Sequence, residues 1–309
     1  MKKKMINSTH IEGLVYEHKL EMKISGDSSK NPGTEFITGT VSLATDDDCT
    51  NIVPVHFTYV TEVTKNGKTN NTFVILKNII DGKIANVMSS GKEAAGMLRI
   101  DSALDLNEWY DQNGTLVSVK RNEGGFVHQT NELCAPENRA TFNTDIIING
   151  TKLIEADEEK KTPEKLIVKG TIFNFRNALL PVEFSVLKPG AINYFSSLDA
   201  SPSNPVFTRV QGQQLSQTVI KTTTEESAFG DAIVKESKSS YRDFVIDWAQ
   251  ADTYEWDSED TILASELSEL MANREVYKAE IKKRQDEYQA SKNNALKTPA
   301  ATTKTEYKF

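Results

Sequence analysis

The stretches FITGTVSLAT (residues 36–45) and LIVKGTIFNF (residues 166–175) decide the fold, because they read as two copies of one β-strand. Both contain a Gly-Thr pair followed by an apolar residue, Gly39-Thr40-Val41 in the first and Gly170-Thr171-Ile172 in the second. In the first copy, apolar and small polar residues largely alternate, as expected for a strand with one buried face. Such self-similarity indicates a duplicated structural unit.

Three further matches follow in the same order along both halves of the chain. NIVPVHFTYV (51–60) matches ALLPVEFSVL (178–187), and a helix-like stretch follows each, at 71–80 and at 191–198. MLRIDSAL (97–104) matches FTRVQGQQL (207–215), with Arg99 and Arg209 between apolar neighbours. ATFNTDIII (140–148) matches YRDFVIDWA (241–249). Four matches in one order support a tandem repeat.

The repeated order is three strands, a helix and two strands, which is the order of the OB-fold barrel. The sequence therefore predicts a mainly β protein with two tandem OB-like five-stranded barrels, each with one helix, and a C-terminal α-helix. We expect domain 1 at 8–148, domain 2 at 149–250, an acidic linker with an amphipathic helix at 251–292, and a disordered tail at 293–309. The alternative is two unrelated β-rich segments of a larger sandwich.

The first copy also carries the pattern of a known family. Its pieces are IEG at Ile11, VSLAT at Val41, VPVHF at Val53, the helix around Phe73, and LRIDSALDLNEW ending at Trp109. In this order they resemble the bacterial and phage single-stranded DNA-binding proteins, here as a tandem duplication. The resemblance implies sequence-tolerant binding of single-stranded DNA in replication or recombination. The family's acidic tail tip ending in Pro-Phe is absent, since Tyr307 and Lys308 precede Phe309.

Sequence-tolerant binding of a single strand needs cations that follow phosphates and aromatic rings on which bases stack. In the first copy the candidates are Arg99, Trp109, Tyr110, Lys120, Arg121, Phe126 and His128. In the second copy they are Phe173, Phe175, Arg176, Arg209, Lys221, Lys235, Lys238 and Arg242. The structural alternatives are that Trp109 is a core or lid aromatic, that at least one of the two phenylalanines is core, and that Arg99 and Arg209 form structural salt bridges.

Composition sets the limits of this interpretation. The net charge of −8 argues mildly against a nucleic-acid partner, and it favours the alternative of a structural or protein-interaction module, such as a virion component, built on duplicated β-domains. Cys49 and Cys134 have no metal-ligand spacing and read as free thiols. We expect no catalytic residues, no metal, no cofactor, no membrane segment and a cytoplasmic location.

The C-terminal region differs from the barrels. Residues 251–260 are acidic, and residues 261–292 read as one helix with an apolar stripe. Packing of this helix on the second barrel is the favoured interpretation, and docking of a replication or recombination protein on residues 251–292 is the alternative. In the second case the acidic stretch could act as a DNA mimic, and deletion from Ala251 onward should tighten DNA binding.

Overall fold

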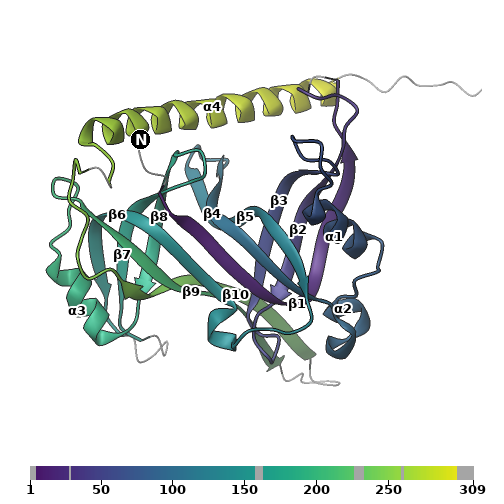
Figure 1. Ribbon diagram of the computed structural model, residues 1–309, viewed down its shortest axis with the longest axis horizontal. Coiled ribbons are helices and arrows are strands. Elements are labelled where there is room, and N and C mark those ends of the chain that lie inside the picture. The colour runs from purple at the N-terminus through teal and green to yellow at the C-terminus, as the bar shows by residue number, and fades with distance from the viewer. Residues whose placement is uncertain (1–4, 28, 157–162, 226–232, 259–260, 298–309) are drawn as a thin grey trace, which may run out of the picture.

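The computed structural model describes residues 5–27, 29–156, 163–225, 233–258 and 261–297. Among these residues, ten strands form one continuous sheet that closes into two barrels lying side by side (Figure 1). The first five strands are β1 (Asn7–Ile24), β2 (Glu35–Ala44), β3 (Ile52–Thr61), β4 (Met97–Tyr110) and β5 (Leu116–Thr130). The second five are β6 (Ala140–Ile154), β7 (Lys165–Phe173), β8 (Leu179–Val186), β9 (Val206–Glu225) and β10 (Ile233–Ala249).

The two barrels have the same topology. In barrel 1 the spatial order is β2-β3-β5-β4-β1, and β1 pairs with β2 to close the ring. In barrel 2 the order is β6-β7-β8-β10-β9, and β6 pairs with β9 to close it. Each barrel has one parallel pair, β3 with β5 and β8 with β10. A helix follows the third strand in each, α1 (Asn71–Ile80) and α3 (Pro189–Ser197). The prediction of two tandem OB-like barrels is therefore confirmed.

One predicted strand correspondence is wrong. The fifth strand of barrel 1 is β5, and residues 140–148, which the repeat had matched to β10, belong to β6. Gly124 and Gly125 interrupt the apolar alternation within β5. Both glycines have positive φ, and the ladder between β4 and β5 shifts register beside them, so they mark a bulge within the strand.

The predicted domain boundary at residue 148 falls inside β6, which is one strand from Ala140 to Ile154. β6 pairs with β7 and β9, the neighbours expected of the first strand of barrel 2. We therefore propose that the division between the barrels lies in residues 131–139, the connection between β5 and β6.

The glycine shared by the two copies serves barrel closure. Gly39 has φ of +123°, and a Cβ there would lie 2.0 Å from the carbonyl oxygen of Lys19 in β1. A Cβ at Gly170 would lie 2.7 Å from the carbonyl oxygen of Ile147 in β6. Only glycine permits such an approach of the second strand to the first.

The barrels also share a seam. β1 pairs with β6 from Asn7 opposite Thr144 to Ile11 opposite Ala140, so the sheet runs through both barrels. Leu104 and Leu106 of β4 lie in the apolar core of barrel 2. These contacts join the two units into one body.

The chain after β10 lies over barrel 2 and then spans both barrels. Tyr254 and Trp256 contact the ring of Phe207, and Ile262 is buried in the same apolar cluster. The long helix α4 (Ala264–Lys297) then runs across the top of the molecule from barrel 2 to barrel 1 (Figure 1). Deletion from Ala251 onward would uncover this cluster. We therefore expect such a truncation to lower the stability of barrel 2.

The helix differs from its predicted bounds. It begins at Ala264 rather than at residue 261, and it continues to Lys297, so residues 293–297 of the predicted disordered tail are helical. Residues 298–309 lie outside the described part of the chain. Two short helical segments, α2 (Val87–Ser90) and a 3₁₀ turn (Lys92–Ala94), precede β4, and a second 3₁₀ turn (Pro136–Asn138) precedes β6. No helix among the described residues is long and apolar enough to span a bilayer.

Candidate nucleic-acid interface

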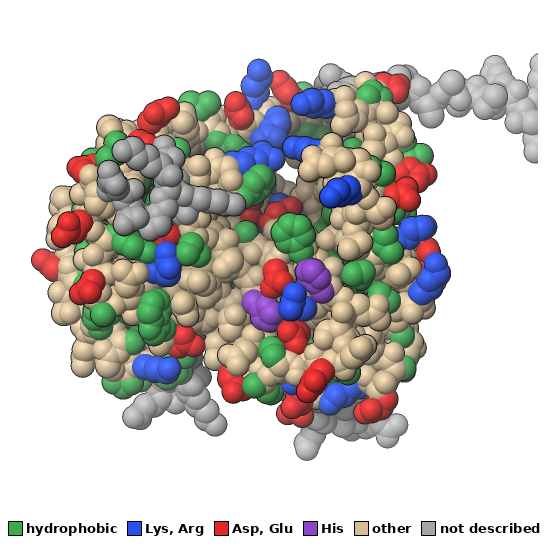
Figure 2. All heavy atoms as spheres, viewed as in Figure 1, with side chains coloured by type: hydrophobic (Ala, Val, Ile, Leu, Met, Phe, Trp, Pro, Cys, Tyr) green, Lys and Arg blue, Asp and Glu red, His purple; other side chains and the backbone are tan. Residues whose placement is uncertain are grey.

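Three predicted residues of the first copy lie together on one face of barrel 1. Arg99 on β4 stands opposite His128 on β5. Phe126 lies two positions before His128 on β5, and 72% of its surface is exposed. His10 on β1 and Asp101 on β4 complete this surface, which we call the barrel 1 face. Figure 2 shows two histidines beside a basic and several acidic side chains near the centre of the view.

Polar contacts hold the side chains of the barrel 1 face in place. His10 Nδ1 lies 2.8 Å from Asp101 Oδ1, and Arg99 Nε lies 3.2 Å from Asp101 Oδ2. Both Arg99 and Asp101 remain more than two-fifths exposed, so their ion pair is screened by water. A cleft of about 430 Å³ adjoins this face, lined by His10, Asp101 and Phe126 and, from the seam, by Thr141 and Asn143.

A second group lies at the far end of the β4–β5 ribbon and at the β7–β8 turn. We call it the α4 rim, and it consists of five predicted residues and one residue of α4: Trp109, Tyr110, Arg121, Phe175, Arg176 and Lys282. Trp109 and Phe175 are 39% and 62% exposed. Arg176 lies 5.0 Å from the centre of the Phe175 ring, and Lys282 lies 5.9 Å from that of Tyr110. The rim therefore combines exposed rings with cations from both barrels and from α4.

The position of α4 above this rim is fixed by two contacts with the end of β4. Gln285 bonds both backbone groups of Tyr110, accepting from its N–H at 2.9 Å and donating to its carbonyl. The guanidinium of Arg274 binds both carboxylate oxygens of Glu108, and both side chains are almost fully buried. Figure 2 shows an opening between the helix and the barrels, with Lys and Arg side chains along its upper margin and acidic ones below.

Asp105 on β4 is a partly buried carboxylate near two of the arginines of the α4 rim. Burial raises the pKa of Asp105, while its bond from the Leu106 N–H and the charges of Arg121 and Arg176 oppose the rise. Arg121 comes from barrel 1 and Arg176 from the β7–β8 turn of barrel 2. Both guanidinium groups therefore act on one carboxylate at the junction of the barrels.

Other predicted residues are used inside the structure. Phe173 is fully buried, so its ring cannot stack on a base and it is withdrawn as a candidate. Lys120 reaches from β5 into barrel 2, where its ammonium donates to the carbonyl of Glu183 and lies 4.8 Å from the centre of the Phe244 ring. Burial lowers the pKa of Lys120 to about 8. The Lys120 ammonium therefore contacts groups of barrel 2 at the seam and does not face solvent as a phosphate contact would.

Arg209 is also held internally, by Asp145 at 2.9 Å. Burial acts to lower the pKa of Arg209, but its hydrogen bond with Asp145 and the charge of that carboxylate raise it overall. Arg242 is exposed on β10. Lys221, Lys235 and Lys238 lie on β9 and β10, and their side chains are outside the described part of the structure.

One aromatic pair was missed by the sequence interpretation. The rings of Phe36 on β2 and Tyr59 on β3 lie 4.5 Å apart, and Tyr59 is 46% exposed. Phe36 stands on the face of β2 that otherwise carries Thr38, Thr40 and Ser42, and an aromatic residue on a polar face was a readable signal. Strict alternation along β3 would put Tyr59 on the buried face with Phe57, but the ladder between β2 and β3 shifts register there.

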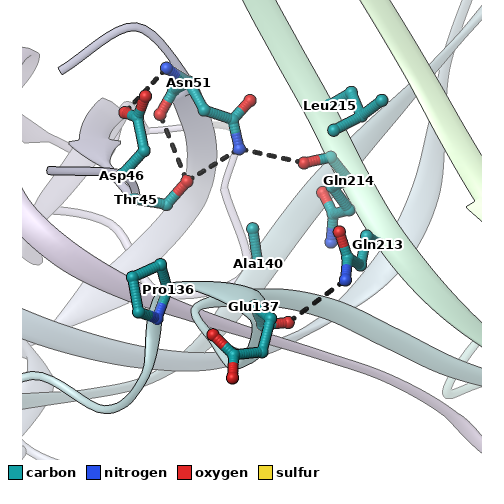
Figure 3. Close-up of a pocket in the computed structure, with 9 residues that line it drawn as sticks. All are labelled: Thr45, Asp46, Asn51, Pro136, Glu137, Ala140, Gln213, Gln214 and Leu215. Atoms are coloured by element: carbon teal, nitrogen blue, oxygen red, sulfur yellow. Dashed lines mark hydrogen bonds between the residues drawn. The ribbon is translucent and has the colours of Figure 1, made fainter. Parts of the chain in front are cut away.

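A separate hollow of about 260 Å³ lies where the β2–β3 turn meets β9 (Figure 3). Asn51 bridges its walls by donating to the Thr45 hydroxyl at 2.8 Å and to the Gln214 carbonyl at 3.1 Å. Asp46 and Glu137 supply the charged groups of its lining, and neither Lys nor Arg contributes to it. Phosphate would be repelled from this hollow, so it is a poor nucleic-acid site.

The comparison with protein families identifies the chain. Residues 5–294 match the model of the YorF family. The chain belongs to the YorF family. Among the curated proteins, none matches this YorF protein. A solved structure that it resembles is a deletion mutant of the single-stranded DNA-binding protein from Thermus aquaticus, with 8% identity and a TM-score of 0.45 over 83% of this chain and 98% of the other.

Proposed function

We propose that this YorF protein binds single-stranded DNA without sequence choice, as a component of replication or recombination. The supporting observation is that cations and exposed rings follow one β-ribbon, β4 with β5, from the barrel 1 face to the α4 rim. Arg99 and Trp109 are ten residues apart on β4, which is about 33 Å of strand. A single strand laid along this ribbon would meet rings for stacking and guanidinium groups for its phosphates.

The proposed contacts fall into two kinds. Phe126, Trp109 and Phe175 would stack on bases, while Arg99, Arg121, Arg176 and Lys282 would approach phosphates. Arg242, Lys221, Lys235 and Lys238 remain proposed contacts on the β9–β10 hairpin. Because Lys120 and Arg209 are tied to internal partners, they would act on the structure of the site rather than on DNA.

The charge pattern limits the strength of this binding. Arg99 and Arg121 already have carboxylate neighbours, Asp101 at 3.2 Å and Glu123 at 2.9 Å. With about four phosphate contacts, the logarithm of the affinity should fall with the logarithm of salt concentration with a slope of about −3. We expect a moderately salt-dependent binder in which stacking supplies much of the affinity.

A fluorescence titration with a labelled oligo-dT tests the proposal at two salt concentrations. Substitution of Phe126 by Ala should weaken binding about 5- to 150-fold, the loss of one stacked base. Tyr59→Ala is the matched control, because it removes an exposed ring of barrel 1 that belongs to β3 and not to the β4–β5 ribbon. Absence of binding at low salt, or binding that does not change with salt, would contradict the proposal.

A structural or protein-interaction module remains the second candidate. It is favoured by the net charge of −8 and by the commitment of Lys120 and Arg209 to internal contacts. Failure of the titration with a folded protein would leave this candidate in its place.

A further inference from the structure

The duplicated fold places a carboxylate at the same position of the first strand in each barrel. Glu12 on β1 stands opposite Arg99 on β4, and Asp145 on β6 stands opposite Arg209 on β9. Both carboxylate side chains are at least nine-tenths buried, with 9% exposure for Glu12 and 1% for Asp145. A buried carboxylate is costly unless a cation and hydrogen bonds compensate it.

In barrel 2 the compensation is complete. Asp145 accepts from Arg209 Nε at 2.9 Å, from the Ile6 N–H at 2.7 Å and from the Tyr254 hydroxyl at 3.1 Å. Its cation is the guanidinium that stands opposite it in the ladder.

In barrel 1 the corresponding guanidinium is turned away. Arg99 pairs with Asp101, and Glu12 instead contacts His10 and Cys134. Glu12 Oε1 accepts the Cys134 N–H at 2.6 Å, and Glu12 Oε2 lies 3.3 Å from His10 Nε2. The buried carboxylate of barrel 1 thus lacks the ladder arginine that its counterpart has, and it faces an imidazole nitrogen and a thiol instead. The nearby guanidinium of Arg139 donates to the Cys134 carbonyl and to Asp47.

These three side chains are of the types that bind metal ions, and they lie close together. One ligand atom from each of His10, Glu12 and Cys134 lies within 4.8 Å of the other two. A tetrahedral zinc ion with bonds of about 2.0–2.3 Å holds its ligands about 3.3–3.8 Å apart, so side-chain adjustments of about 1 Å would close the set. No other group of this kind is found among the residues that the structure describes.

The surroundings of His10 fit the same chemistry. Its Nδ1 lies 2.8 Å from Asp101 Oδ1, which directs Nε2 toward Glu12. If Nδ1 carries the proton, Nε2 presents a lone pair to a carboxylate, and a cation between the two removes the repulsion. A carboxylate on the far nitrogen of a histidine ligand is the usual arrangement around protein-bound zinc.

We propose that His10, Glu12 and Cys134 bind one divalent transition-metal ion, zinc foremost, at the edge of the barrel 1 face. Nitrogen, oxygen and sulfur ligands together suit zinc, and three protein ligands leave a fourth position for water. The ion takes the place that the Arg209 guanidinium holds in barrel 2, and it fixes the 131–139 connection to β1.

The test uses the metal-stripped full-length chain and two titrations. Equilibrium dialysis should give one Zn²⁺ per chain, and Co²⁺ should produce a thiolate-to-cobalt absorption band together with the visible bands of a tetrahedral ion. Cys134→Ser should abolish the thiolate band, and His10→Gln should lower Zn²⁺ affinity at least 10-fold. The controls Cys49→Ser and His128→Gln should keep both signals, since neither residue belongs to the set.

Alkylation of the unmodified chain tests the site without any variant, so the result does not depend on whether a variant folds. Saturating Zn²⁺ should shield Cys134 from alkylation by iodoacetamide while Cys49, also half-buried, keeps its reactivity. Binding of no Zn²⁺, a Co²⁺ band lost equally in Cys49→Ser, or equal alkylation of Cys134 with and without Zn²⁺ would overturn the proposal. These results do not depend on DNA binding, so the two proposals fail separately.

Discussion

Barrels 1 and 2 repeat one topology but differ in what happens to the same face. On barrel 2 the chain covers the first and fourth strands with its own aromatic residues, Tyr254 and Trp256. Beneath them Asp145 is buried and its partner Arg209 is largely covered. On barrel 1 the matching strands carry Arg99 and Asp101, which remain exposed beside Phe126. The shared topology gives two equivalent surfaces, and the one on barrel 2 is covered while the one on barrel 1 is open.

The largest expected difference between the barrels lies in their matched arginines. Arg209→Ala leaves Asp145 buried without its cation and should cost about 3–5 kcal/mol of unfolding free energy. Arg99→Ala removes an exposed ion pair and should cost about 0–1 kcal/mol. Urea denaturation of both variants gives the two values. Equal losses would show that the two faces do not differ in the way that their burial indicates.

The helix that joins the barrels should respond to loss of its buried anchor. Arg274→Ala leaves Glu108 without its cation, with only the Ser118 hydroxyl still donating to it. The substitution should cost about 2–3 kcal/mol, less than a core pair, because α4 can detach and admit water. Arg284→Ala is the control, since Arg284 is exposed on the same helix. Faster proteolysis within residues 264–297 of the Arg274 variant alone is the expected result, and unchanged proteolysis would contradict the anchoring role.

The seam between the barrels should give a pH-dependent stability. The pKa of Lys120 is lowered to about 8 by burial, against an ordinary value of 10.5. Between these values the unfolded chain binds the proton and the folded chain does not. The unfolding free energy should therefore rise with pH, by up to about 1.4 kcal/mol per pH unit from this group.

Denaturation between pH 7 and 9.5 checks this window, and Lys120→Met should remove the rise. The upper limit avoids the region in which Tyr241 contributes in the opposite direction, since burial and its bond to Asp243 raise the pKa of Tyr241. A rise that persists in the Lys120 variant would assign the effect to other groups.

The repeat in the sequence was sufficient to predict the architecture, because the Gly-Thr pair and the following strand recur with the same neighbours. It failed at β5, where a bulge at Gly124 and Gly125 interrupts the alternation on which strand prediction depends. Because the sequence match assigns residues 140–148 of β6 as the fifth strand of barrel 1, the predicted domain boundary falls at residue 148, inside β6.

The candidate site was less accessible to prediction, because exposure is a property of packing between distant segments. Residue type identified Phe126, Phe175 and Arg176, which are exposed, but it did not distinguish Phe173, which is core, or Lys120, which crosses the seam. In the set of His10, Glu12 and Cys134, Cys134 is more than 120 positions from the other two residues. The spacing along the chain therefore gave no sign that the three lie together.

The central claim is that single-stranded DNA lies along the β4–β5 ribbon of barrel 1 while the covered face of barrel 2 stays free. Photocrosslinking of an oligo-dT that carries 4-thiothymidine, followed by mass spectrometry of the crosslinked peptides, tests it most directly. We predict crosslinks within residues 97–130 and at the β7–β8 turn around Phe175. Crosslinks confined to the Phe36 and Tyr59 surface or to residues 205–215, or no crosslink at low salt, would contradict it.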